Sequence, residues 1–216
     1  MKLVSVNVGL PREVTWKGKT VRTGIFKEPV NTRVMVRSLN LDGDGQADLA
    51  VHGGLEKAVY VYPLEHYDYW RSELPDTELT MGNFGENFTV TGFKEEELNI
   101  GDLFQIGDVK LMVTQPRMPC YKLGIRFGRP DMVKRFLVSH RTGFYFSVLQ
   151  EGEVGTGDTL ELVSQDANNI TVADITQLYT RDQTDPKLLH RAAQLEALSE
   201  SWRDYFQEQI RRQDRG

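Results

Sequence analysis

The single cysteine of the chain lies in its most basic stretch. Residues 115–130 carry four basic side chains and no acidic one, and the stretch 115–141 reaches a net charge of +6. Nearby cations favour the thiolate form of a cysteine, which attacks electrophiles and binds soft metals. The same cations would hold an anionic ligand, most naturally a phosphate. Cys120 is therefore a candidate nucleophile or metal ligand, beside the alternative that it is a small buried apolar side chain.

The residues before this cysteine favour a loop that presents it. Pro116 and Pro119 stiffen the segment that follows a strand predicted for Val109–Gln115, because proline disfavours helical backbone in the residue before it. We therefore expect Cys120 on a stiff loop open to ligands rather than inside a strand.

A cysteine hydrolase would need a histidine partner, and the chain contains four histidines. His66 and His190 fall on helical patterns among charged neighbours, which indicates surface positions for both. His140 follows a predicted helix, where it is placed to end that helix. The fourth histidine, His52, has a different setting.

His52 stands before two glycines, between a polar loop and a predicted strand. Gly53 and Gly54 would let a ligand approach backbone N–H groups, and Lys57 adds a positive charge. A hairpin-like turn with a structural histidine explains the same residues, so both interpretations stay open at this point.

A second glycine-rich segment spans residues 82–89 and contains Asn83 and Asn87. Its amide groups could bind a polar heterocycle or a phosphate. Turn formation alone also explains asparagines among glycines.

The acidic segment 42–49 looks like a calcium-binding loop. It lacks the central glycine and the final glutamate that such a loop requires, and its flanks are strand-like rather than helical. We interpret this acidic segment as a polar turn.

The elements that must position these residues are mostly strands. Apolar and polar residues alternate, which predicts strands over 2–8, 32–39, 57–62, 87–91, 103–106, 109–115, 144–150 and 159–163. Helical periodicity predicts helices over 63–74, 130–139, 171–180, 186–196 and 199–212. This pattern favours a mainly β fold of the α+β class, a closed or nearly closed barrel with peripheral helices. We divide the chain into a barrel domain, 1–165, and a small C-terminal helical appendage, 166–216.

Composition argues against several classes of protein. The net charge is −5, whereas binders of nucleic acid and of anionic membranes carry a basic excess. No apolar run approaches the roughly 18 residues that a membrane helix needs, and the first residues lack a signal-peptide pattern. The single cysteine excludes an internal disulfide and a zinc site built on several thiolates, and it favours a reducing cytoplasm.

Five ordered segments carry a resemblance to a known family. They are Gly45–Asp48 with His52–Gly54 and Lys57–Val59, Asn83–Asn87, Leu98–Asp102, Gln115–Leu123, and Gly143–Tyr145 with Val154–Asp158. Taken in this order, they resemble the MOSC family (the molybdenum cofactor sulfurase C-terminal domain), and within it the YiiM-type bacterial branch, over essentially the whole chain. The helical end resembles the three-helix, or 3-alpha, domain that often follows a MOSC domain.

This resemblance implies a MOSC-type β-barrel that binds a molybdenum cofactor, a molybdopterin whose metal is bound by Cys120. It implies a cytoplasmic oxidoreductase that reduces N-hydroxylated compounds, namely hydroxylaminopurines, amidoximes and hydroxamic acids, and so gives detoxification and resistance to 6-N-hydroxylaminopurine. Electrons would come from a separate flavin-type reductase, because one cysteine cannot hold an iron–sulfur cluster and the chain has no flavin or haem motif. A soft thiolate suits molybdenum, and the basic stretch suits the cofactor phosphate.

The remaining candidates are residues that would hold the cofactor. Asn87 matches the asparagine of the family's cofactor-binding segment. Eukaryotic members carry an arginine two residues earlier, where this chain has Gly85, so the phosphate contact must come from another cation. The candidate cations are Arg33, Lys57, Arg117, Lys122 and Arg141, and His52, Gly53, Gly54 and Asn83 complete the candidate set.

Two other functions fit the same residues. A thiolate in a basic loop could carry a persulfide, which would make Cys120 part of a sulfur carrier. A non-catalytic module could instead store the molybdenum cofactor or hand it on. The aromatic helix over 199–212 fits either a clamp on the barrel or a homodimer surface, and neither nucleic acid nor a membrane is expected as a partner.

Overall fold

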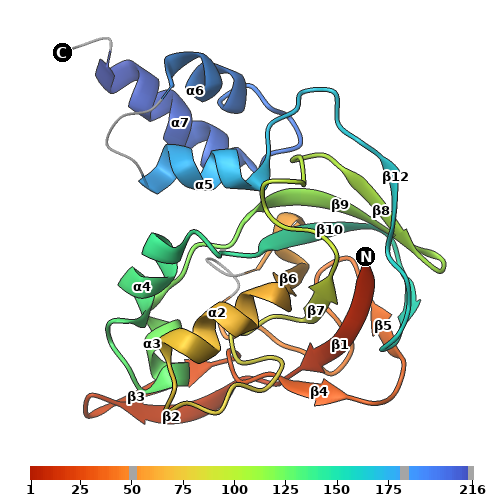
Figure 1. Ribbon diagram of the computed structural model, residues 1–216, viewed down its shortest axis with the longest axis vertical. Helices are drawn as coiled ribbons and strands as arrows, with labels where there is room; N and C mark the ends of the chain where they lie inside the picture. The colour runs from red at the N-terminus through yellow and green to blue at the C-terminus, as the bar shows by residue number, and fades with distance from the viewer. Residues whose placement is uncertain (49–52, 181–184, 214–216) are drawn as a thin grey trace.

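The computed structural model describes residues 1–48, 53–180 and 185–213. It has an α+β fold in which one eight-stranded sheet curls into a half-barrel (Figure 1). The strands of this sheet, in spatial order, are β12 (Glu161–Ser164), β8 (Leu103–Ile106), β9 (Val109–Pro116), β10 (Phe144–Gln150), β6 (Val59–Pro63), β7 (Phe88–Thr91), β1 (Lys2–Val8) and β4 (Glu28–Val30). Two further strand pairs are β2 (Arg12–Trp16) with β3 (Lys19–Thr23), and β5 (Val34–Val36) with β11 (Gly152–Val154).

Neighbouring strands of the large sheet run antiparallel except for β6 and β7. These two are parallel because helix α2 (Glu65–Glu73) follows β6 and carries the chain back before β7 begins. The segment that leads into β12 bonds to the start of β1: Leu3 N donates to Asp158 O at 2.9 Å, and Leu160 N donates to Met1 O at 2.9 Å. The expected α+β fold, with a curled sheet and peripheral helices, is confirmed.

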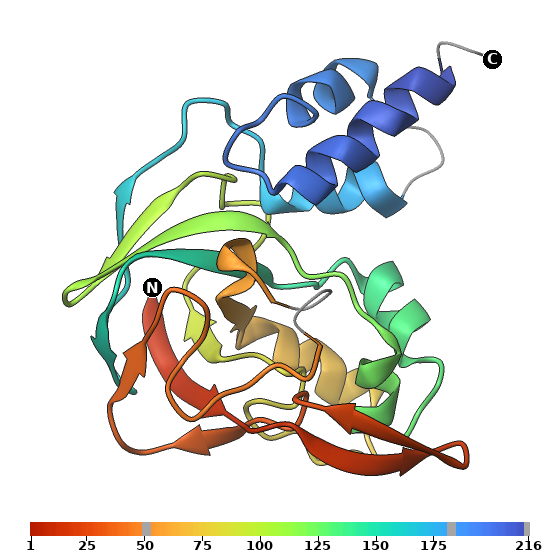
Figure 2. The same cartoon turned by 180° about the vertical axis from the view of Figure 1, so that it is seen from behind.

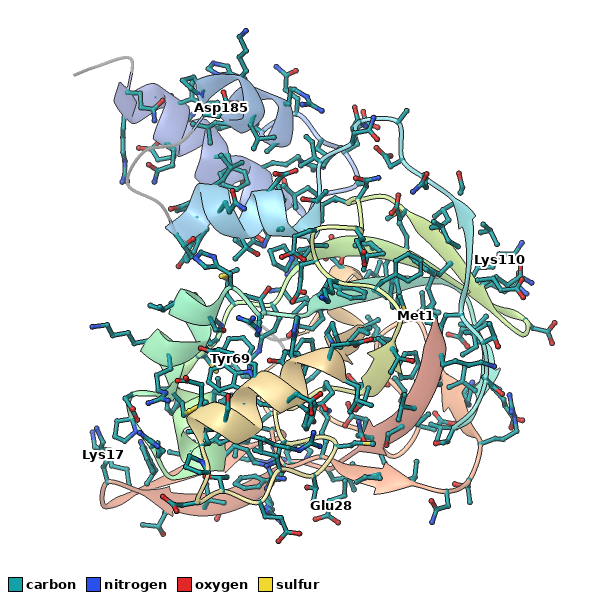
Figure 3. All side chains as sticks on the ribbon, in the orientation of Figure 1. Met1, Lys17, Glu28, Tyr69, Lys110 and Asp185 are labelled. Carbon is teal, nitrogen blue, oxygen red and sulfur yellow. The ribbon has the colours of Figure 1, made fainter. Side chains whose placement is uncertain are left out.

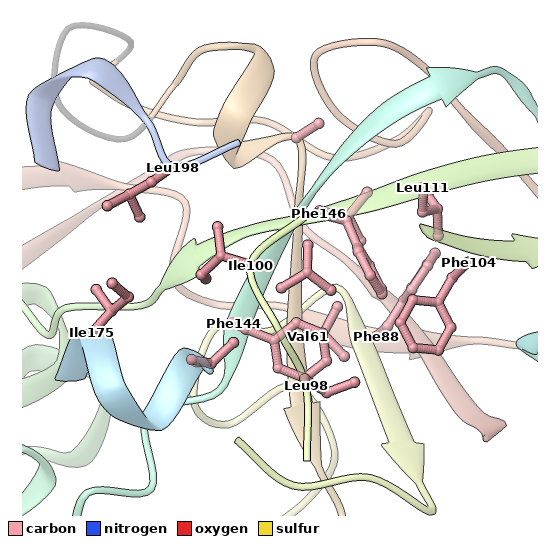
Figure 4. Packing of buried hydrophobic residues seen from close by; sticks show 14 of the residues in the cluster. Val61, Phe88, Leu98, Ile100, Phe104, Leu111, Phe144, Phe146, Ile175 and Leu198 are labelled. Atoms are coloured by element: carbon pink, nitrogen blue, oxygen red, sulfur yellow. The ribbon is translucent and has the colours of Figure 1, made fainter. Parts of the chain in front are cut away.

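The apolar core fills the inside of the curl. Phe88, Phe104, Phe144 and Phe146 are fully buried on strands of the large sheet (Figure 4). Burial of a phenylalanine side chain stabilises a fold by roughly 1.5–3 kcal/mol. Alternation along these strands therefore fixes which residues face the core and which remain available for a site.

Three helices end the described chain: α5 (Val172–Thr180), α6 (Pro186–Ala192) and α7 (Glu200–Gln213). Figures 1 and 2 show α5 between α7 and the sheet. Ile175 on α5 and Phe206 on α7 are fully buried and belong to the same apolar cluster as the strands. Of the three helices predicted for this end of the chain, those over 171–180 and 199–212 are confirmed. The helix predicted over 186–196 ends earlier than expected, at Ala192. The division of the chain at residue 165 stays a prediction.

The sequence patterns missed a helix directly after Cys120. Helix α3 (Tyr121–Phe127) begins directly after Cys120, and α4 (Met132–Ser139) follows where a helix was predicted. Gly124 lies inside α3 and lowers its helix propensity by about 1 kcal/mol relative to alanine. The structure explains this glycine, because a Cβ there would lie 2.9 Å from the Arg129 carbonyl oxygen. A helix of two turns interrupted by glycine leaves too little periodicity to be predicted.

The hairpin of β2 and β3 was also missed by the sequence patterns. Lys17 and Gly18 form its turn with φ angles of 50° and 76°, which is the backbone of a two-residue hairpin. The hairpin lies beside α3 in both views of the ribbon (red in Figures 1 and 2). Within the described parts of the chain, no helix combines the length and apolar character needed to cross a bilayer.

Candidate functional site

A cleft that opens to solvent encloses about 640 Å³ next to the start of α3. Its walls come from the end of β3, the residues before position 48, strands β6 and β10, the turn before β7 and the segment around Cys120. The described lining residues are Thr23, Gly24, Ile25, Lys27, Gly45, Gln46, Ala47, Lys57, Tyr60, Gly85, Asn87, Arg117, Met118, Cys120, Lys122 and Tyr145. We call this cleft the candidate site.

The described walls of the candidate site are positively charged. They include the cations Lys27, Lys57, Arg117 and Lys122 and no carboxylate. Arg117 is 6% exposed and Lys122 is 8% exposed. A cleft with low-dielectric walls and charges of one sign concentrates ligands of the opposite sign. The candidate site therefore favours an anionic ligand such as a phosphate.

Arg117 lies between two aromatic rings. Its Cζ is 5.3 Å from the ring centroid of Tyr60 and 5.0 Å from that of Phe136, which is the range of a cation–π contact. Its Nη1 is buried and has no hydrogen-bond partner among the described residues. A buried donor without a partner costs roughly 1–3 kcal/mol. An anion in the candidate site would supply the missing bond.

Tyr145 faces Arg117 from strand β10. Burial raises the pKa of the Tyr145 hydroxyl, and the charge of the Arg117 guanidinium offsets part of that effect. Tyr60 on the neighbouring strand donates its hydroxyl proton to the Thr142 carbonyl oxygen at 2.9 Å. Both tyrosines therefore stay neutral near pH 7 and do not offset the positive charge of Arg117.

Cys120 lies in the wall of the candidate site at the residue that precedes α3. Its backbone is extended, with φ −120° and ψ 173°, and its carbonyl oxygen accepts the Leu123 N–H at 2.9 Å. The residue is half-buried, so the expectation that the cysteine is presented rather than enclosed in a strand is confirmed. The thiol lines the same cleft as Arg117 and Lys122, as the spacing in the sequence suggested.

Asn87 also lines the candidate site, but protein atoms already use its amide. Its Oδ1 accepts the Tyr60 N–H at 3.1 Å. Its Nδ2 donates to Asp44 Oδ2 at 2.9 Å and to the Asn7 carbonyl oxygen at 3.4 Å. Asn87 therefore joins β6, β1 and the acidic segment behind the cleft.

Lys27, which lines the candidate site, forms a buried ion pair with Asp44 that the sequence analysis missed. The Lys27 ammonium donates to both Asp44 carboxylate oxygens, and Asp44 Oδ1 also accepts the Gly9 N–H at 2.9 Å. Burial lowers the pKa of Lys27, and Asp44 opposes that shift. No motif surrounds Lys27, so only the folded chain reveals the pair. The sequence analysis interpreted the acidic segment only as a polar turn. The structure shows that its Asp44 carboxylate also has a structural role, as the partner of Lys27.

Several candidates from the sequence lie elsewhere. Arg33 is exposed and pairs with Asp158, with Nη2 3.0 Å from Oδ2. Arg141 lies with its Cζ 4.0 Å from the ring centroid of Tyr69, outside the candidate site. Asn83 Oδ1 accepts from Arg126 Nη2 at 2.5 Å rather than facing the cleft.

The glycine pair contributes no described wall of the cleft. Gly53 and Gly54 precede the short helix η1 (Leu55–Lys57), and His52 lies outside the described residues. Of the sequence candidates, the fold thus gathers Lys57, Asn87, Arg117, Cys120 and Lys122 around one cleft.

The other three histidines lie on or next to helices. His140 ends α4 with a left-handed backbone, φ 54°, and His190 is exposed on α6, as expected. His66 is only 6% exposed, so the expectation of a surface position is wrong. Its Nε2 lies 2.7 Å from Oε2 of Glu95, a carboxylate that comes from a distant part of the chain and covers this side of α2. A histidine among charged sequence neighbours is therefore exposed only when no distant residue, such as Glu95 here, packs against it.

A curled half-barrel, a cysteine in a cationic cleft and a three-helix end define a recognisable class. The MOSC domain model matches residues 48–161, and the YiiM-like 3-alpha helix domain model matches residues 170–213. The chain therefore belongs to the MOSC domain family, in its YiiM-like branch.

Relatives and solved structures support this assignment. YflK of Bacillus subtilis is 43% identical over 94% of this chain and 92% of its own, and YiiM of Escherichia coli is 36% identical over 83% and 81%. A Gibberella moniliformis protein named a reductase is 32% identical over 90% of this chain, which corresponds to 35% of that longer protein. The crystal structure of YiiM from Geobacillus stearothermophilus matches with a TM-score of 0.80 at 34% identity, covering 96% of this chain and 97% of that one.

Proposed function

We propose that this chain is a molybdenum cofactor-dependent oxidoreductase that reduces N-hydroxylated compounds. The observation that carries the proposal is one cleft that Cys120 shares with Arg117, Lys57 and Lys122. The Arg117 Nη1 there is buried and has no hydrogen-bond partner within the described parts of the chain. Membership of the MOSC family and the reductase name of one relative support it. Hydroxylaminopurines, amidoximes and hydroxamic acids are the proposed substrates.

The residues of the candidate site fit such a cofactor. The Cys120 thiolate is the soft ligand that molybdenum prefers. Arg117, Lys57 and Lys122 would hold the cofactor phosphate through charge-assisted hydrogen bonds. Gly85, with φ 83°, presents no side chain at the place where eukaryotic members of the family carry an arginine. Arg117 and Lys122, which line the same cleft, would meet the phosphate charge instead.

When bound, the cofactor supplies two-electron chemistry that the chain's own side chains lack. The overall reaction converts an N–OH group to N–H and releases water, using two electrons and two protons. We propose a separate flavin-type reductase as the electron source, and cytoplasmic detoxification as the setting. The residues of the chain bind and orient: Arg117 and the lysines hold the anionic end, and Cys120 holds the metal.

A reduction assay tests the proposal. Protein from a host that makes the cofactor is given 6-N-hydroxylaminopurine and an artificial reductant, and formation of adenine is measured for wild type and for Cys120→Ser. We expect turnover in wild type and a loss of at least about a hundredfold in the variant. Arg22→Gln is the matched control, because Arg22 is an exposed cation on β3 outside the cleft.

Two outcomes would replace the proposal. Wild-type protein without turnover but with a reductant-labile mass gain of one sulfur on Cys120 would indicate a sulfur carrier. Protein that holds the molybdenum cofactor but shows no turnover with any electron donor would indicate a carrier module.

A further inference from the structure

A second cleft, of about 550 Å³, lies beside α2 and contains a buried pair of ionisable groups. It is lined by Glu65, His66, Tyr69, Lys94, Glu95, Glu96, Ser139, His140 and Arg141; Tyr69 is labelled in Figure 3. The side chains of His66 and Glu95 are 8% and 2% exposed. The proposed reaction uses neither residue directly, because neither lines the candidate site.

The pair holds a backbone amide. His66 Nε2 is 2.7 Å from Glu95 Oε2, and Glu95 Oε1 accepts the Gly143 N–H at 2.7 Å. Burial alone would raise the pKa of the Glu95 carboxyl, but the hydrogen bond and charge of His66, with the Gly143 N–H, bring it below its ordinary value. Glu95 is therefore ionised near pH 7 and binds the Gly143 amide strongly.

The backbone on both sides of the Gly143 Cα also contacts the candidate site. The Gly143 carbonyl oxygen accepts the backbone N–H of Arg117 at 3.3 Å, and the Thr142 carbonyl oxygen accepts the Tyr60 hydroxyl at 2.9 Å. Arg117 and Tyr60 both line the candidate site. The Thr142–Gly143 peptide is thus held by Glu95 through its N–H and holds Tyr60 through its carbonyl oxygen. The next peptide holds Arg117 through the Gly143 carbonyl oxygen.

We propose that His66 and Glu95 are positioning residues for the candidate site, acting through the backbone of Thr142 and Gly143 on Tyr60 and Arg117. The inference rests on the proposed function in one respect: the anion that Arg117 receives is the cofactor phosphate. A polar pair buried for packing alone gains little, because its loss of hydration offsets its attraction. A directed hydrogen bond to a backbone amide gives the pair a role that an apolar pair of equal size could not fill.

The test measures amide hydrogen exchange residue by residue on the full chain without cofactor. His66→Leu and Glu95→Gln are compared with wild type, and Glu96→Gln is the matched control, because Glu96 lines the same cleft but is exposed. We expect exchange at Arg117 and Gly143 to accelerate roughly tenfold in the two variants. Exchange in α6 and α7 should stay unchanged, as it should everywhere in the control.

A second measurement separates positioning from simple loss of stability. Inorganic pyrophosphate is titrated into each protein below its unfolding temperature. We expect its affinity to fall about fivefold in His66→Leu, and to be restored in His66→Gln, whose amide N–H stands where Nε2 donates. Acceleration of exchange throughout the molecule, unchanged exchange at the two amides, or unchanged pyrophosphate affinity in His66→Leu would overturn the proposal.

Both readouts are independent of molybdenum. An enzyme without turnover whose variants still show the local exchange and weaker pyrophosphate binding would overturn the proposed function and leave the positioning role standing. Full turnover in His66→Leu with unchanged exchange would overturn the positioning role and leave the proposed function standing.

Discussion

Asn87 donates a hydrogen bond from Nδ2 to Oδ2 of Asp44 at 2.9 Å, and this bond ties the turn before β7 to the acidic segment behind the candidate site. Asp44 is at the same time the partner of the buried Lys27 ammonium. The asparagine that the family pattern assigns to cofactor binding thus also supports the wall of the cleft. Its loss should affect folding as well as binding.

Replacing Asn87 should lower stability. In Asn87→Ala, the Tyr60 N–H loses its side-chain partner, while Asp44 Oδ2 loses the amide but keeps the Lys27 ammonium. A buried donor left unpaired costs roughly 1–3 kcal/mol. Urea unfolding should show a decrease of this size. Asn168→Ala, at an exposed residue, is the control and should change the free energy of unfolding by less than about 0.5 kcal/mol. Equal effects in the two variants would contradict the supporting role.

Breaking the Lys27–Asp44 pair should cost more than breaking a surface pair. Lys27→Met leaves the Asp44 carboxylate, whose side chain is 1% exposed, without its cation, and such a change typically costs about 3–5 kcal/mol. Arg33→Met removes an exposed partner of Asp158 and should cost less than about 1 kcal/mol. Thermal unfolding of the two variants side by side measures the difference. Similar losses of stability in the two variants would mean that burial does not increase the contribution of the Lys27–Asp44 ion pair.

Gly143 should tolerate no side chain. Its φ is 65°, and an added Cβ would lie 2.3 Å from the Val61 carbonyl oxygen. Gly107 has a similar φ of 57° but nothing within 4 Å of an added Cβ, so it separates backbone strain from the clash. Gly107→Ala should destabilise by about 1 kcal/mol, and Gly143→Ala by at least about 2 kcal/mol more. Equal free energies of unfolding for the two variants would argue against the close approach to β6.

The His66–Glu95 pair should make the free energy of unfolding depend on pH in the acidic range. Because the pKa of Glu95 in the folded chain lies below its ordinary value of 4.5, its stabilising contribution is present above that value and is lost as the pH falls through the folded pKa. The difference in free energy of unfolding between wild type and Glu95→Gln should therefore be largest near neutral pH and shrink below about pH 4. Urea unfolding across this range measures it, and a difference that grows toward acid would contradict the assignment.

The sequence predicted the parts of the fold that periodicity controls. Strands such as β9 and β10 alternate clearly, and α5 and α7 carry apolar stripes, so their positions followed from the residues. The β2–β3 hairpin and α3 did not, because a lysine–glycine turn and a two-turn helix containing Gly124 leave little periodic signal.

The candidate site was predicted where charge and chemistry are local. Cys120, Arg117 and Lys122 lie within six residues, and their shared cleft could be expected. Lys27 could not, because its importance comes from Asp44, 17 residues away, and the burial of His66 depends on Glu95, 29 residues away. Residues that matter through a distant partner carry no pattern in one sequence.

The most direct test of the central claim is the molybdenum content of the protein with and without the Cys120 thiolate. Wild type and Cys120→Ser are purified from a host that makes the cofactor, and metal content and X-ray absorption at the molybdenum edge are measured for both. We expect near-stoichiometric molybdenum in wild type, and in the variant either loss of the metal or loss of one sulfur neighbour. Equal molybdenum content with an identical edge spectrum in both proteins would contradict Cys120 as the metal ligand.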